Sequence, residues 1–214
     1  MKIITISREF GSGGRELGKR LADALGIAYY DRELITMAAQ QANLDEAYVE
    51  RTLENGVLKQ YPLTVSRTLA SHPLHSAGSA PHILAQQHNI IRELAAKGDC
   101  VIVGRGSDAV LAEYHPLKIF VYADMDSRIA RCKSRADASE TLSERELERK
   151  IKQIDKARAA NHALAASYAW GDKRGYHLCL NTTDLDIASV VPHLAAFAQS
   201  WFERRDSRNG NSII

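Results

Sequence analysis

Short apolar runs alternate along the chain with longer amphipathic segments. The apolar runs predict strands at residues 2–7, 27–30, 99–104, 117–122 and 177–181. Helical periodicity predicts helices at 15–25, 83–97, 126–135, 143–168 and 187–203, with a further one in the acidic stretch 44–55. Uniformly apolar strands that alternate with helices are typical of a parallel sheet buried on both faces. The pattern predicts an α/β fold with a doubly wound, five-stranded parallel sheet that binds ligands beyond the carboxyl ends of its strands.

The segment 56–82 breaks the alternation of predicted strands and helices. It is rich in proline and delays the third strand far beyond an ordinary connection. We expect a single domain over residues 1–205, with 56–82 as a variable flap and 206–214 as a frayed polar tail. His72, His75 and His82 suggest a metal site, but no Cys or carboxylate shares a ligand spacing with them, so no metal site is predicted.

Composition and charge exclude several classes of protein. The 214 residues are 45% hydrophobic and 25% charged, with a net charge of +2, which is ordinary for a globular domain and too mild for a nucleic-acid partner. No apolar run is long enough to span a membrane, and the first predicted strand leads into Arg8 and Glu9 rather than a cleavage site. We therefore expect a cytoplasmic protein without a membrane partner. The three cysteines have no CxxC spacing and are expected to be buried side chains rather than catalytic groups or ligands: Cys100, Cys132 and Cys179.

A glycine-rich turn joins the first predicted strand to the first predicted helix. The sequence REFGSGG places three glycines within four residues at this junction. Glycines let backbone N–H groups converge, and the unpaired N–H groups of a helix N-terminus attract anions, so phosphate is the expected ligand. A turn that serves only tight packing remains the structural alternative.

Two nucleotide-binding architectures use a glycine-rich turn at a helix N-terminus, and the sequence motif of neither is complete here. For the dinucleotide pattern G-x-G-x-x-G, Gly11 and Gly13 match but Glu16 occupies the third glycine position. Asp31 follows at the spacing of a ribose-binding acid, although it would equally well cap the next helix. For the P-loop pattern G-x-x-x-x-G-K-[ST], Gly14 occupies the lysine position and Arg15 the hydroxyl position.

Arginines at the predicted strand ends and on one helix favour phosphate chemistry. Arg105 stands between two glycines directly after a strand, where its guanidinium would meet a phosphate or carboxylate. A second set lines one side of the predicted helix 126–135 at i, i+3 and i+7 spacing: Arg128, Arg131 and Arg135. The alternatives are a surface turn for Arg105 and a solvated helix face for the other three. Asp155 and Arg158 would likewise pair along their helix without any ligand.

Four stretches of the chain resemble the cytidylate kinase-like family, relatives of the P-loop nucleoside monophosphate kinases. These stretches are ISREFGSGGRELGKRLADALGIAYYDRELI, VIVGRGSDAVLAEYHPLKIFVYADMDSRIARC, LSERELERKIKQIDKARAANHALAASYAWGD and HLCLNTTDLDIASVV. The resemblance covers residues 1–55 and 83–200 and leaves out the flap. It implies a P-loop NTPase-like sheet with a helical lid.

The resemblance also implies roles for individual residues. Four loop residues would cradle the donor phosphates: Gly11, Ser12, Gly13 and Gly14. Arg105 and Arg158 would hold the acceptor phosphate, and Asp155 would orient the acceptor or an arginine. The lid would carry Arg128, Arg131 and Arg135.

The sequence departs from the family pattern at the loop and after the third predicted strand. The usual P-loop lysine is replaced by Gly14, and phosphoryl transfer still requires a cation there. Arg15 is the nearest replacement, with Lys19 one turn further along the same helix face. The aspartates that flank Gly-Arg in cytidylate kinases are Val103 and Gly106 here, which puts cytosine specificity in doubt.

These observations predict a nucleotide kinase that uses ATP and Mg²⁺. It would transfer the γ-phosphoryl group to a CMP- or dCMP-like nucleoside monophosphate or another small phosphate acceptor. The missing lysine motivates a rival hypothesis, a nucleotide-binding regulatory or sensing module without turnover. A dinucleotide-dependent oxidoreductase is the third hypothesis, and the absent third glycine weighs against it.

Overall fold

The computed structural model describes the whole chain except residues 32, 44, 48–79, 136–141 and 211–214. Five parallel strands form one sheet: β1 Ile3–Arg8, β2 Ala28–Tyr30, β3 Cys100–Val103, β4 Leu117–Tyr122 and β5 Leu178–Asn181. Their spatial order is β2-β3-β1-β4-β5. Every residue of β1 and β3 is buried, as expected for central strands that are covered on both faces. The predicted fold class is confirmed.

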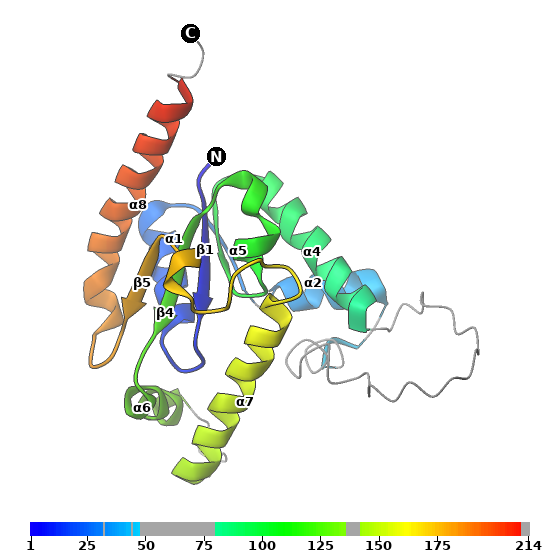
Figure 1. Cartoon of the computed structure of the whole chain (residues 1–214), viewed down its shortest axis with the longest axis vertical. Coiled ribbons are helices and arrows are strands. Elements are labelled where there is room, and N and C mark those ends of the chain that lie inside the picture. The colour runs from blue at the N-terminus through cyan, green and yellow to red at the C-terminus, as the bar shows by residue number, and fades with distance from the viewer. Residues whose placement is uncertain (32, 44, 48–79, 136–141, 211–214) are drawn as a thin grey trace, which may run out of the picture.

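Helices cover both faces of this sheet (Figure 1). Alternate strand residues face opposite sides: Ile4 and Ile6 pack with α1 (Gly14–Leu25) and α8 (Ile187–Gly210), whereas Ile3 packs on the other face. That face is covered by α2 (Glu33–Ala42), α4 (Ala80–Ala96) and the short α5 (Ser107–Val110). The β1–α1 junction therefore lies at the centre of the carboxyl edge of the sheet, with β3 and β4 on either side.

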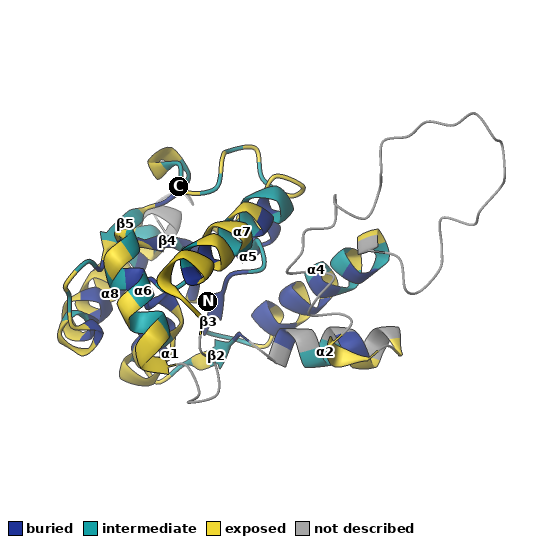
Figure 2. Ribbon diagram, turned by 90° about the horizontal axis from the view of Figure 1, so that it is seen from below, coloured by how far each residue is buried: buried dark blue, intermediate teal, exposed yellow. Residues whose placement is uncertain are grey.

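Two further helices lie beyond that edge. Helix α6 (Met125–Arg135) follows β4. The N-cap of α7 (Glu144–His162) is Ser143, whose side chain forms a capping box with Glu146. Buried and exposed positions alternate around α4 and α7 (Figure 2). Two 3₁₀ turns, Ala112–Tyr114 and Lys173–Gly175, complete the described elements.

Two helix ends differ from the predictions. Helix α7 ends at His162 rather than 168, where the N–H groups of Leu164 and Ala165 bond three residues back, to the Asn161 and His162 carbonyls, and tighten the last turn. Helix α8 continues to Gly210, past the predicted end at 203 and into the expected frayed tail. Its last turns are held by Arg205, which packs on Phe202 and donates to the Met1 carbonyl.

Two other predictions concern residues that are largely undescribed. The expected helix within 44–55 and the flap 56–82 fall mostly outside the described residues; residues 80–82 belong to α4. No helix in the described part of the chain combines the length and the apolar character needed to span a membrane.

Candidate functional site

The glycine-rich turn is a tightly packed loop at the N-terminus of α1. Gly11 and Gly13 have φ values of 80° and 83°, which side-chain-bearing residues rarely adopt. A Cβ on Gly11 would lie 2.8 Å from the Arg128 carbonyl oxygen, and one on Gly13 would lie 2.9 Å from the Ile187 Cδ1. Ser12 is buried, and its hydroxyl donates to the Glu9 carbonyl at 2.9 Å. The loop is therefore held in one shape, with the backbone N–H groups of the α1 N-terminus available to an anion.

Arg128 and Asp155 hold the start of this loop rather than lining a cavity. The Arg128 Nε donates to the Phe10 carbonyl at 2.7 Å, and its guanidinium pairs with Glu9 at 3.2 Å and with Asp155. Asp155 also accepts the Phe10 N–H at 2.8 Å. Burial raises the pKa of Glu9, against the opposing charge of Arg128. Arg128 is thus a buried clamp between α6, α7 and the loop, whereas the sequence predicts a phosphate-facing lid residue.

Gly14 leaves no room for the lysine of a standard P-loop. A Cβ at this position would lie only 2.6 Å from the Cβ of Arg8, the last residue of β1. Arg8 is buried, and its guanidinium in turn lies where a side chain on Gly104 would be, 1.4 Å from that Cβ position. The space beside the loop is therefore occupied by an arginine from β1.

Four arginines surround this point, and Asp31 is the carboxylate that pairs with two of them. Arg8 lies 3.5 Å from Asp31, and Arg15 pairs with the other oxygen of the same carboxylate. Burial lowers the pKa of Arg8 well below its usual value, and the charges of Arg158, Arg105 and Arg15 lower it further, with only Asp31 opposing them. An excess of positive charge in a partly buried site favours a bound anion.

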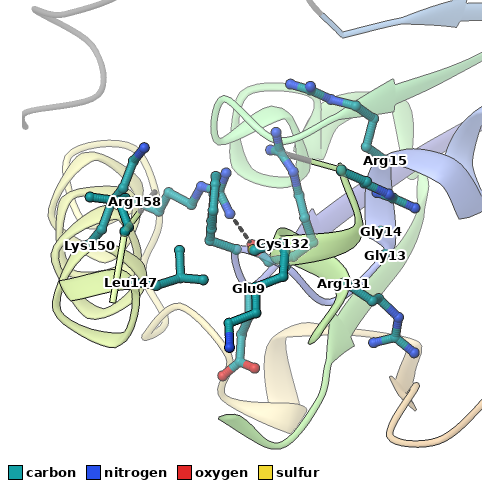
Figure 3. A pocket seen from close by; sticks show the side chains of 15 residues that line it. Glu9, Gly13, Gly14, Arg15, Arg131, Cys132, Leu147, Lys150 and Arg158 are labelled. Carbon is teal, nitrogen blue, oxygen red and sulfur yellow. Dashed lines mark hydrogen bonds between the residues drawn. The ribbon is translucent and has the colours of Figure 1, made fainter. Parts of the chain in front are cut away.

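A cavity of about 500 Å³ opens over the loop. Figure 3 shows Gly13, Gly14 and Arg131 on one side of it and Lys150, Leu147 and Arg158, from α7, on the other. Among the described residues that line it, seven are basic and only Glu9 is acidic. The basic residues are Arg8, Arg15, Arg131, Lys133, Arg135, Lys150 and Arg158.

A second, smaller cavity of about 80 Å³ lies on the β3 side of the same arginines. Arg8, Arg15 and Arg158 line both cavities, and Arg105 lines the second one. Arg105 has a φ of 61° between two glycines that also have positive φ values, so the turn after β3 presents it at the sheet edge. Arg158 donates to the Arg8 carbonyl at 3.0 Å and packs over the Phe10 ring. The two cavities thus meet at a shared set of cations.

The remaining predicted residues lie in different surroundings. Arg131 donates to the Thr182 and Leu185 carbonyls, and Arg135 pairs with Glu16, although both residues line the first cavity. Lys19 instead pairs with Asp23 at 2.5 Å on the exposed side of α1 and lines neither described cavity. The prediction that Lys19 faces the phosphates is therefore not supported by its position.

Sequence reasoning missed several residues of the site. From the sequence, Arg8 was noted only as the residue that follows the first predicted strand, and its charge was not recognised as part of the cluster. Lys150 lies two turns before Arg158 on α7 and could have been found by extending the spacing from that arginine. Lys133 lies off the face of α6 that carries Arg128, Arg131 and Arg135, so their spacing does not mark it. Gln87 and His162 line the second cavity, and nothing in their local sequence marks them.

A buried polar network forms the floor near the second cavity. Asp108 accepts hydrogen bonds from Ser7 at 3.1 Å and from Tyr168 at 2.8 Å, and its other contact is His162 Nε2 at 2.8 Å. Burial alone would raise the pKa of Asp108, but the hydrogen bond and charge of His162, with the bonds from Tyr168 and Ser7, hold it below its usual value. The network joins β1, α5 and α7 beneath the arginines.

Comparisons with known proteins agree with this architecture. The model of the cytidylate kinase-like family matches residues 3–184. A cytidylate kinase from Herpetosiphon aurantiacus is 26% identical over 192 residues, with 76% of this chain and 83% of the relative covered.

Solved structures show a similar fold. An uncharacterised protein from Eubacterium ventriosum superposes with a TM-score of 0.65 at 24% identity, covering 94% of this chain and 99% of the other. A shikimate kinase from Bacteroides thetaiotaomicron gives a TM-score of 0.56 at 17% identity, covering 92% and 98%. The chain belongs to the cytidylate kinase-like family and has a P-loop NTPase-like fold.

Proposed function

We propose that this member of the cytidylate kinase-like family is an ATP-dependent nucleotide kinase. It transfers the γ-phosphoryl group of ATP to a nucleoside monophosphate of the CMP or dCMP type. The observation that carries the proposal is the basic cavity over the glycine loop, in which seven cationic side chains and one acidic side chain surround a helix N-terminus. Phosphoryl transfer depends almost entirely on positioning and on stabilising negative charge, and this cavity provides both.

The two cavities divide the substrates between them. The backbone of Gly11, Ser12, Gly13 and Gly14 binds the donor phosphates in the first cavity, with Arg131 and Arg135 at its rim. Arg105 holds the acceptor phosphate in the second cavity. Arg158 lines both cavities and so lies where the transferred group passes.

Two arginines are available to replace the missing lysine. Arg8 is buried beside the loop. The Arg15 side chain is 57% exposed, and Asp31 is its ion-pair partner among the described residues. A phosphate that binds at the α1 N-terminus competes with Asp31 for both guanidinium groups. We therefore propose that Arg15 moves from Asp31 onto the donor phosphates while Arg8 supplies a fixed charge.

Mg²⁺ is proposed to enter with ATP. Three described carboxylates at the loop are each paired with arginine, namely Glu9, Glu16 and Asp155, so the phosphate oxygens and water would be the main ligands, as Mg²⁺ prefers in such sites. When bound, the ion would neutralise charge that develops on the phosphates. The proposed partners are small nucleotides, and the proposed location is the cytoplasm.

A nucleotide panel tests the proposed activity. Purified protein is incubated with ATP, Mg²⁺ and each of CMP, dCMP, UMP, AMP, GMP and shikimate, and ADP release is measured. We expect ADP release with a nucleoside monophosphate. ATP should also raise the melting temperature, since a ligand that binds only the native state stabilises it.

Gly13→Val tests the loop itself, because Gly13 has a φ of 83° and an added Cβ would lie 2.9 Å from the Ile187 Cδ1, so the loop must shift. The variant should lose the ATP-induced thermal shift. Protection by NADH but not by ATP would refute the nucleotide kinase assignment.

The regulatory module without turnover remains a second candidate, favoured by the steric exclusion of lysine at position 14. It would become the better assignment if the protein binds ATP but phosphorylates no acceptor in the panel.

A further inference from the structure

Thr182 directly follows β5 and joins the turn after that strand to the glycine loop. The residue is fully buried, and its hydroxyl donates to the Ser12 carbonyl at 2.7 Å across a sequence separation of 170 residues. Among the hydrogen bonds of the described residues, this is the one that the Ser12 carbonyl accepts. A side chain from beside the edge strand therefore sets the direction of a carbonyl in the loop.

The surroundings of the Thr182 hydroxyl direct its proton to Ser12. Arg131 Nη1 donates to the Thr182 Oγ1 at 3.3 Å, so this oxygen already accepts a hydrogen bond. The Tyr122 carbonyl lies 3.1 Å from Oγ1, but it already accepts the Thr182 backbone N–H at 2.9 Å. A hydroxyl has a single proton to donate. The shorter contact, to the Ser12 carbonyl, is therefore the bond that this proton forms.

The Ser12 carbonyl and the Gly13 N–H belong to the same peptide group. Because that group is planar and trans, its C=O and N–H point in opposite directions. The bond from Thr182 thus turns the Gly13 N–H away from the turn after β5. No hydrogen bond within the described part of the chain uses this N–H, and Gly13 lines the first cavity. The N–H is therefore kept available to an anion there.

We propose that Thr182 is a positioning residue for the donor phosphates. Its hydroxyl fixes the peptide group between Ser12 and Gly13, so that the Gly13 N–H donates to a phosphate oxygen in the first cavity. Thr182 lines neither described cavity and acts only through the loop backbone. The inference rests on the proposed function and deepens it, because it names a residue outside the cavity on which phosphate binding depends. A fixed N–H that donates to a charged oxygen forms a stronger bond than a neutral pair does.

Thr182→Val tests this role, because valine keeps the shape of the side chain and removes the hydroxyl. The dissociation constants of ATP and of inorganic tripolyphosphate are measured by calorimetry, well below the melting temperature. We expect both ligands to bind about tenfold more weakly to the variant, as a misdirected hydrogen bond to a charged group implies. Thr182→Ser retains the hydroxyl and should bind both ligands nearly as tightly as the native protein does.

Thr5→Val is the matched control. Thr5 is a fully buried residue of β1, and its hydroxyl has no hydrogen-bond partner among the described residues. The substitution removes the same group from an equally buried position without removing a bond to the loop. The affinity for tripolyphosphate should therefore stay unchanged.

The amide signal of Gly13 separates positioning from a general loss of stability. Saturating tripolyphosphate should move the Gly13 amide proton of the native protein downfield, because a new hydrogen bond to phosphate forms, and should move it much less in Thr182→Val. The lost bond should also lower the melting temperature by about 2–4 °C. A merely structural role would lower that temperature and leave the amide shift intact. Arg131 keeps its bonds to the backbone carbonyls of Thr182 and Leu185 in the variant, so its charge stays at the cavity.

Three results would overturn the proposal: native tripolyphosphate affinity in Thr182→Val, an equal loss of affinity in Thr5→Val, or a native Gly13 amide shift in Thr182→Val saturated with tripolyphosphate. Failure of the proposed kinase activity would look different. Tripolyphosphate would still bind, and Thr182→Val would still weaken that binding, but no acceptor would give ADP release.

Discussion

Position 14 shows what sequence can and cannot predict about a single residue. The absence of lysine from the loop is evident in the sequence, and Arg15 is the natural replacement because it begins the same helix. The sequence does not show that Arg8 packs against Gly14, because that contact depends on how the loop folds back over the end of β1. The cation that lies deepest in the site was missed for this reason.

We predict that Gly14→Lys impairs the enzyme rather than improving it. Its Cβ would lie 2.6 Å from the Arg8 Cβ, which is not the mobile end of that side chain, so Arg8 or the loop must shift. Such overpacking should lower the free energy of unfolding by about 1–3 kcal/mol and reduce kcat. Denaturant unfolding and ADP release measure the two effects.

Gly26→Ala is a suitable control for Gly14→Lys. Gly26 has a φ of 65° but no neighbouring atom within 4 Å of the added Cβ, so backbone strain alone should cost about 1–2 kcal/mol and leave kcat intact. A faster enzyme with lysine at position 14 would contradict the steric argument.

Arg15→Ala should reduce kcat by about 10²–10³ while most of the ATP-induced thermal shift remains, because the lost charge acts mainly on the transferring group. The fold should be little affected, since the side chain is 57% exposed. Lys19→Ala is the matched control because its partner is Asp23, away from the cavity. Normal turnover in Arg15→Ala combined with a loss in Arg8→Lys would assign the role to Arg8 instead.

At the scale of elements, the end of α7 illustrates a limit of local pattern. The apolar and Ala-rich sequence predicts a helix to 168, whereas the chain leaves the helix after His162 and brings the Tyr168 hydroxyl to Asp108. That partner is 60 residues away in the sequence, so no local signal could reveal the turn. The capping box that begins α7 is local and agrees with the predicted start at Ser143.

The Arg128 clamp gives a prediction about how α6, α7 and the loop are joined. Arg128→Ala would leave the Glu9 carboxylate partly buried without its cation and would leave Asp155 with Arg158 at 3.7 Å, and should lower the free energy of unfolding by about 3 kcal/mol. Arg135→Ala removes an exposed pair with Glu16 and should cost less than about 1 kcal/mol. Denaturant unfolding of both variants tests this contrast, and equal effects would show that Arg128 is not a clamp.

At the scale of the whole molecule, the alternation of apolar runs and amphipathic segments was sufficient to predict the parallel sheet and the helices on both faces. The central strands β1 and β3 are buried on both faces, so each appears in the sequence as a run of mainly apolar residues. Ion pairs between residues far apart in the sequence leave no such pattern, as with Arg128 and Asp155 or Arg8 and Asp31. The arginines were therefore found as candidates, but their division into clamp and cavity-lining residues required the structure.

The Asp108 network gives a prediction about stability and pH. Because the pKa of Asp108 is lower in the folded protein than its ordinary value of 3.8, the unfolded chain binds more protons as the pH falls through this range. Its contribution to stability should be complete above about pH 4 and lost as the pH falls through the lowered pKa. Unfolding free energies of the native protein and Asp108→Asn should differ most at neutral pH and converge in acid. A constant difference would exclude Asp108 as the titrating group.

Arg158 lines both cavities, and its removal tests whether the two cavities act together in the transfer step. Its guanidinium bonds to the Arg8 carbonyl, lies 3.7 Å from Asp155 and lines both cavities, so it can contact both phosphates only when both substrates are bound. Interactions that form fully only in the transition state affect kcat more than the binding of either substrate. Arg158→Ala should therefore lower kcat by at least about tenfold more than it weakens ATP binding, with Lys156→Ala, an exposed neighbour on the same helix, as the control. Equal losses in kcat and in ATP affinity would mean that Arg158 serves only to bind the donor, and the two cavities would then have to be treated as separate sites.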